Sequence, residues 1–152
     1  MLPGGSEFVV WREGRMQVCP WQSMQVASLQ GVRRLRHQLA GLLEWLVVAH
    51  GCHLSPVQRE RILLLQTELM TNAVKYASPH ARYIGFHCWQ RHGQCWLEWH
   101  DDGGYFNSLQ GRRVMASPIA DHGYGLYLIR SLAPKIQYRS IQSQNRYRLP
   151  LL

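Results

Sequence analysis

The fold of this chain is decided by the stretch Glu68-Leu-Met-Thr-Asn72-Ala-Val-Lys75-Tyr76. Its apolar residues continue a helical spacing that marks the central segment as a helix. Ser55-Pro56 offers a helix N-cap followed by a proline at the first helical position. Apolar residues then recur at steps of three and four, at Ile62, Leu65, Leu69, Ala73 and Tyr76. We therefore predict a helix that runs to about Ala77 and ends before Pro79.

Polar side chains interrupt the apolar pattern of that helix. Glu68 and Asn72 are four residues apart, so both project from one face, and Lys75 extends the same polar stripe. A solvated helix face is the ordinary interpretation of such a stripe. Asparagine is unfavourable inside helices, however, and Asn72 lies among core residues. A carboxylate and an amide oxygen at these positions suit a general base and a ligand for a hard cation.

Two further motifs follow along the chain. Asp101-Asp-Gly103-Gly-Tyr-Phe106 places a carboxylate at the end of a predicted strand, on the side of Leu97 and Trp99. The glycines after it allow a turn and the close approach of a flat ligand, whose amine could donate to the carboxylate. His122-Gly123-Tyr-Gly125-Leu-Tyr-Leu128 opens a helix with backbone N–H groups that favour phosphate. Each motif alone is also an ordinary turn, but the set describes a nucleotide pocket.

The other elements are predicted from periodicity and turn residues. Helical steps mark Ser28 to about His50 and Gly125 to about Leu132. Strands are predicted at about 8–11, 16–19, 84–88, 95–101, 136–141 and 147–149, with a polar loop over 109–121. This order predicts the α+β class: a two-layer sandwich with helices on one face of a mostly antiparallel sheet.

Length and composition bound the function. The 152 residues fit a single domain, 1–152, in which residues 1–20 would form N-terminal strands. Apolar residues make up 46% and charged residues 17%, as in an ordinary globular protein. No secretory signal is visible, and no apolar stretch approaches the roughly 20 residues of a membrane span. We expect a cytoplasmic protein that contacts no membrane.

The formal net charge of +8 raises nucleic acid as a partner. The basic residues are scattered in pairs, however, and an acidic protein partner together with a polyanionic nucleotide explains the excess as well. We therefore expect no nucleic acid. The four cysteines, Cys19, Cys52, Cys88 and Cys95, lack paired metal-ligand spacing. Small strand hydrophobes are the favoured interpretation, over a metal site that would include the nearby histidines.

Taken in order, the three motifs resemble the boxes of the GHKL (histidine kinase-like) ATPase superfamily, over about Ser28 to Ile141. The resemblance implies binding of ATP and Mg²⁺ and gives each motif a role. Glu68 would be the general base and Asn72 the magnesium ligand. Asp101, with Gly103 beside it, would hold the adenine amino group.

The resemblance extends to the phosphate side. The third box would line the phosphates with Gly123, Tyr124, Gly125 and Leu126. The ending of the first box looks like that of histidine kinases, which implies that Lys75 reaches phosphate and Tyr76 lies against adenine. The ATP lid would cover 107–122, and Arg112 or Arg113 within it could steady the γ-phosphate.

The chain departs from the family pattern in two places. Tyr105 stands where the second box usually has another glycine, which predicts a stiffer lid hinge. Gln144-Asn145-Arg146 stands where the late Gly-Thr box is expected, and that box is not recognisable.

Small size, a short lid and Gly-Tyr-Gly-Leu-Tyr-Leu-Ile-Arg are similar to free-standing anti-sigma factor serine kinases. This implies a serine-protein kinase that phosphorylates an anti-sigma-factor antagonist and binds a sigma factor. Two alternatives stay open: a histidine kinase catalytic domain acting in trans, and a non-catalytic module that binds nucleotide. A homodimer is also implied, in which Phe8–Trp11 pairs at a sheet edge, unless this segment packs on its own core.

Overall fold

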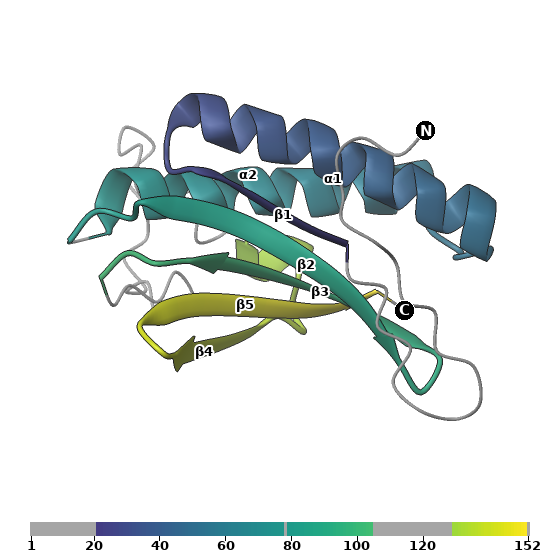
Figure 1. Ribbon diagram of the computed structural model, residues 1–152. Coiled ribbons are helices and arrows are strands. Elements are labelled where there is room, and N and C mark those ends of the chain that lie inside the picture. The colour runs from purple at the N-terminus through teal and green to yellow at the C-terminus, as the bar shows by residue number, and fades with distance from the viewer. Residues whose placement is uncertain (1–20, 78, 105–128, 152) are drawn as a thin grey trace.

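The computed structural model describes residues 21–77, 79–104 and 129–151. Figure 1 shows two helices on one face of a five-stranded sheet. The elements are β1 (Trp21–Val26), α1 (Leu29–His50), α2 (Pro56–Tyr76), β2 (Tyr83–Arg91), β3 (Gln94–Asp101), β4 (Gln137–Ile141) and β5 (Gln144–Leu151). Neighbouring strands pair antiparallel in the order β1-β2-β3-β5-β4. The predicted α+β sandwich is confirmed.

Both long helices begin at a serine cap. Oγ of Ser28 accepts from the backbone N–H of Gly31 at 2.9 Å. Ser55 and Gln58 form a reciprocal capping box, with bonds of 3.1 and 2.7 Å. The first helix ends at Gly51, whose φ of 62° lies in the left-handed region that glycine takes freely. The predicted helices that begin after Ser28 and after Ser55 are confirmed.

The core fills the space between the helical layer and the sheet. Its fully buried side chains include Leu35, Leu39, Leu65, Leu69, Phe86, Leu97 and Trp99. One polar pair lies among them: Nε1 of Trp99 donates to Oε1 of the buried Gln66 at 2.8 Å. This bond joins α2 to β3 and therefore fixes how the helix lies along the strand.

Two hairpins carry two-residue turns with positive φ at both central positions. The β2–β3 turn has φ of 51° at His92 and 76° at Gly93. The β4–β5 turn has 51° at Gln142 and 61° at Ser143. Such paired values are typical of type I′ turns, whose twist matches that of the strands.

Strand β1 was not predicted, and its pattern explains why. Gln25 and Ser23 face α1, where both side chains donate to Oε1 of Gln38. Met24 and Val26 point away and are 59% and 65% exposed. The apolar residues are thus on the side opposite to the helices, which removes the usual signal of a half-buried strand. Strand β5 also begins earlier than predicted, because its first residues are polar.

On the sheet face opposite the helices, the carboxylate of Glu98 is fully buried. It accepts from Arg146 at 3.1 Å and from Arg148 at 3.0 Å, and Nε2 of His87 lies 3.5 Å away. The guanidinium of Arg148 lies 4.9 Å from the centre of the Trp89 ring. This cluster links β2, β3 and β5 on their outer side.

Several predictions fall on residues outside the described part of the chain. These are the N-terminal strands within 1–20, the lid 107–122, and the helix from Gly125, of which residues 129–132 are described and helical. Among the described residues, no helix has the length and apolarity needed to cross a bilayer.

Candidate nucleotide-binding site

Asp101 is the last residue of β3 and faces the helical layer with Leu97 and Trp99, as the strand parity predicts. Its side chain is buried, with only 2% of the residue exposed. Oδ1 accepts two hydrogen bonds, from the backbone N–H of Gly103 at 3.0 Å and from Nδ2 of Asn145 at 2.9 Å. Within the described residues both hydrogen bonds to this carboxylate go to Oδ1, so Oδ2 could accept a hydrogen bond from a ligand.

Asn145 is the site residue that sequence reasoning missed. Its Nδ2 also donates to the backbone oxygen of Gly104 at 3.1 Å, and its Oδ1 accepts from the hydroxyl of Tyr138 at 2.7 Å. The antiparallel register places Asn145 directly opposite Asp101. Asn145 belongs to the segment in which the Gly-Thr box was expected, and only the strand register reveals that it pairs with Asp101.

The electrostatics of Asp101 depend on this arrangement. Burial raises the pKa of the carboxyl, the hydrogen bonds from Asn145 and Gly103 lower it, and the charge of Asp102 raises it. The pKa stays above its ordinary value as a result. A ligand amine that donates to Oδ2 would favour the ionised form further.

Asp102 has a different task, although it is the neighbouring residue. Its Oδ1 accepts from the backbone N–H groups of Arg82 and Tyr83 at 2.7 and 2.9 Å. Its Oδ2 lies 3.1 Å from Nε of the largely exposed Arg82. Asp102 therefore stabilises the start of β2. Of the two neighbouring carboxylates, it is Asp101 that faces the helices.

The end of α2 comes against this corner of the sheet. A Cβ placed on Gly103 would lie 2.6 Å from Cβ of Ala77, the C-cap residue of the helix. The backbone N–H of Gly104 donates to the oxygen of Pro79 at 2.8 Å. Gly103 therefore packs against Ala77 at the end of α2, and this close contact is possible because glycine has no side chain.

The predicted residues of the first box lie along the same end of α2. Glu68 and Asn72 are half-buried, whereas Lys75 and Tyr76 are exposed. At 1.5 Å per residue, Asn72 precedes Ala77 by about 7.5 Å along the helix axis, and Glu68 by about 13.5 Å. The distance from the corner at Asp101 therefore increases along α2 from Tyr76 and Lys75 to Asn72 and then to Glu68.

The phosphate side of the prediction cannot be placed in the same way. Gly123, Tyr124, Gly125 and Leu126 lie outside the described residues, as do Arg112 and Arg113. Their roles stay predictions.

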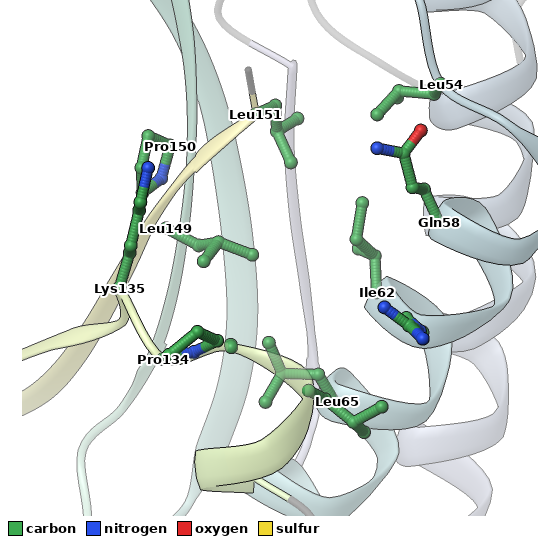
Figure 2. Close-up of a pocket in the computed structure, with 12 residues that line it drawn as sticks. Leu54, Gln58, Ile62, Leu65, Pro134, Lys135, Leu149, Pro150 and Leu151 are labelled. Atoms are coloured by element: carbon green, nitrogen blue, oxygen red, sulfur yellow. The ribbon is translucent and has the colours of Figure 1, made fainter.

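An apolar pocket of about 230 Å³ lies elsewhere, between the first half of α2 and the end of β5 (Figure 2). Its lining includes Leu54, Ile62, Leu65, Leu149 and Leu151, together with Lys135 and Pro150. Its lining contains no carboxylate that could accept from an exocyclic amine. None of the predicted site residues lines it, so it is separate from the corner around Asp101.

The described residues contain no cluster of three or more His, Cys, Asp or Glu side chains that could hold a metal ion. The cysteines among them, Cys52, Cys88 and Cys95, are reduced.

The comparisons with known proteins agree with this geometry. A family model described as the histidine kinase-like ATPase domain matches residues 27–149. This chain belongs to the histidine kinase-like ATPase family. The matched range includes both helices, all of β2 and β3, and Asn145. Membership in this ATPase family supports nucleotide binding.

A solved structure has a similar fold. It is the crystal structure of the RsbU and RsbW domains of Rv1364c from Mycobacterium tuberculosis, with a TM-score of 0.54 and 18% sequence identity over 86% of this chain. Our chain spans 31% of the length of that chain. At this identity the likeness concerns the fold alone. No curated protein sequence matches the chain.

Proposed function

We propose that this histidine kinase-like ATPase domain is a serine-protein kinase of the anti-sigma factor type. It binds Mg²⁺-ATP, transfers the γ-phosphate to a serine of an anti-sigma-factor antagonist, and binds a sigma factor in the cytoplasm. The fold likeness to a structure that includes an RsbW domain supports this assignment. The family match supports the nucleotide as the ligand.

The observation that carries the nucleotide-binding part of the proposal is the environment of Asp101. Asp101 lies beside the end of α2, with 2% of the residue exposed and two donors on Oδ1. Its carboxylate can accept one further hydrogen bond. The 6-amino group of adenine is such a donor, whereas guanine has an oxygen at that place. We therefore expect selectivity for adenine.

Glu68 and Asn72 would do the chemistry at the phosphate end. The hydroxyl oxygen of the substrate serine attacks the γ-phosphorus, and its proton passes to the carboxylate of Glu68. The bond from phosphorus to the β–γ bridging oxygen breaks, and ADP leaves. The amide oxygen of Asn72 would hold the magnesium ion, which neutralises the developing phosphate charge.

Calorimetry with ATP and GTP tests the nucleotide assignment. Asp101→Asn should weaken ATP binding by about 1–3 kcal/mol, because a buried acceptor is then mismatched with its donor. Asp102→Asn is the matched control, since Asp102 holds Arg82 and Tyr83 and faces away from the helices. Equal affinity of the unchanged protein for ATP and GTP would refute adenine recognition by Asp101.

A phosphate-transfer assay with labelled ATP tests the chemistry. Glu68→Gln should abolish transfer to a partner protein while leaving ATP binding within about twofold, since Glu68 acts on the attacking hydroxyl. Glu60→Gln is the control on the same helix, because within the described part of the chain that side chain forms only an exposed pair with Arg36 at 3.3 Å. Nucleotide binding without transfer to any partner would favour the non-catalytic module.

The stability of the phosphoprotein separates the remaining kinase classes. Phosphoserine survives acid, whereas phosphohistidine is lost in acid and survives base. The Lys75-Tyr76 ending of the first box favours the histidine kinase alternative, in which this domain acts in trans. An acid-labile product would select that alternative. The homodimer stays a proposal, and light scattering of the chain with and without residues 1–12 tests it.

A further inference from the structure

The end of the molecule opposite Asp101 holds two cysteines in contact. Sγ of Cys52 lies 4.0 Å from Sγ of Cys95, although 43 positions separate them in the sequence. Cys52 belongs to the connection between α1 and α2, and Cys95 to the start of β3. Figure 1 shows that this connection and the β2–β3 hairpin lie at the same end of the fold.

Both residues are fixed at the backbone. The N–H of Cys52 donates to the oxygen of Leu46, and its own oxygen accepts from Leu54, each at 3.0 Å. Cys95 is held in the ladder of β3 between Gln90 and Leu151. A disulfide needs the sulfurs at about 2.05 Å, so oxidation has to bring the two sulfur atoms about 2 Å closer.

The two thiols differ in access. Cys52 is partly exposed, whereas Cys95 is buried, with 9% of the residue exposed. Together with His50, Cys88, Trp89 and other residues they line a small cavity of about 50 Å³. An oxidant therefore meets Cys52 first, and Cys95 lies within reach of the oxidised sulfur.

We propose that Cys52 and Cys95 form an intramolecular disulfide when the protein meets a peroxide. The thiolate of Cys52 attacks one peroxide oxygen, and the O–O bond breaks to give a sulfenic acid and hydroxide. The thiol of Cys95 then attacks the sulfenic sulfur, its proton passes to the departing oxygen, and water leaves. Two thiols are oxidised, and one hydrogen peroxide is reduced to two waters.

The consequence is mechanical. The disulfide joins the α1–α2 connection to β3 and removes freedom from the unfolded chain across a long loop, which stabilises the fold. Cys95 and Asp101 lie at opposite ends of β3, about 20 Å apart at 3.3 Å per residue. The oxidised protein should therefore unfold at higher temperature and bind nucleotide with the same affinity within twofold.

The test uses the full chain with Cys19→Ser and Cys88→Ser, which leaves only this pair of the four cysteines. After treatment with hydrogen peroxide, thiol titration of the denatured protein should find neither thiol, and peptide mapping should find the 52–95 crosslink in the monomer. Dithiothreitol should restore both thiols and the lower unfolding temperature. The unsubstituted chain should give the same crosslink.

Cys52→Ser in the same background is the matched control, because it keeps the shape of a partly exposed side chain. It should show no crosslinked peptide and no rise in unfolding temperature. Two outcomes would overturn the proposal. One is that both thiols still titrate after a dose that fully oxidises glutathione. The other is that Cys88 or Cys19 of the unsubstituted chain, or a second molecule, supplies the partner sulfur.

Discussion

Asn145 on β5 donates from Nδ2 to Oδ1 of Asp101 on β3 at 2.9 Å, and the same nitrogen reaches the backbone oxygen of Gly104 at 3.1 Å. One amide therefore holds both the carboxylate and the chain that follows it. Its own oxygen is held by Tyr138 of β4. The edge hairpin of the sheet is in this way part of the candidate adenine site.

Replacing Asn145 should weaken nucleotide binding. In Asn145→Ala, Oδ1 of Asp101 loses one of its two donors and the carboxylate is held less firmly, so we expect a loss of about 1–3 kcal/mol in ATP affinity by calorimetry. Tyr138→Phe removes the bond from the hydroxyl to Oδ1 of Asn145, which does not touch Asp101 directly, and should cost less. Ser140→Ala is the control, since Ser140 is exposed on β4 and its backbone lies opposite Asn145 of β5 in the strand register. Unchanged affinity in Asn145→Ala would separate Asn145 from the site.

Gly103→Ala should destabilise the fold. The added Cβ would lie 2.6 Å from Cβ of Ala77 and 3.1 Å from Oδ1 of Asp101, so the end of α2 has to shift, at about 1–3 kcal/mol. Gly41→Ala is the matched control: Gly41 lies exposed within α1 with no atom close to the added Cβ. That change should stabilise the protein by up to about 1 kcal/mol, because alanine favours helix. Urea denaturation measures both, and equal effects would contradict the predicted contact.

Stability should fall as the pH drops from about 6.5 to about 4. Burial, followed by the neighbouring charges of His87 and Arg146, lowers the pKa of His100 to about 4, against smaller opposing effects of Glu98 and Asp102. The unfolded chain therefore binds more protons in this window, so acid favours unfolding, by up to about 3 kcal/mol for a shift of this size. The pKa of His87 is lowered also, first by burial, and adds in the same direction.

His100→Gln tests this pH dependence. The variant should lose less stability than the unchanged chain between pH 6.5 and 4 in denaturation experiments. Asp101, whose pKa is raised, contributes with the opposite sign, and the comparison between the two proteins cancels that contribution. Parallel curves would show that His100 is not buried in its neutral form.

Gln66 and Trp99 offer a double-mutant cycle. Gln66→Leu leaves the indole N–H of the buried Trp99 without its acceptor and should cost about 1–3 kcal/mol. Trp99→Phe removes the donor instead, and the smaller ring also leaves a cavity in the core. In the double variant the unsatisfied donor is gone, so the two costs should add up to more than the measured total. Strict additivity would mean that the 2.8 Å bond contributes nothing.

The sequence predicted those parts of the fold that follow local rules. The stripe from Ile62 to Tyr76 and the Ser55-Pro56 cap were sufficient for α2, and alternation between Ile84 and Asp101 was sufficient for the central hairpin. The direction of Asp101 followed from strand parity. All these signals come from residues within a few positions of each other.

What the sequence did not predict depends on contacts between distant segments. Strand β1 turns its polar residues toward Gln38, so its pattern is inverted. Asn145 gains its meaning only from the register that places it opposite Asp101, 44 positions away.

The β4–β5 turn has a practical consequence for engineering the domain. Ser143 adopts a φ of 61° that disfavours residues with a Cβ, whereas the β2–β3 turn has glycine at the corresponding position, with a φ of 76°. The β2–β3 hairpin thus supplies the template: Ser143→Gly would relieve the strain of a left-handed backbone conformation two residues before Asn145. A more stable variant can be sought there without changing any atom of Asp101 or Asn145.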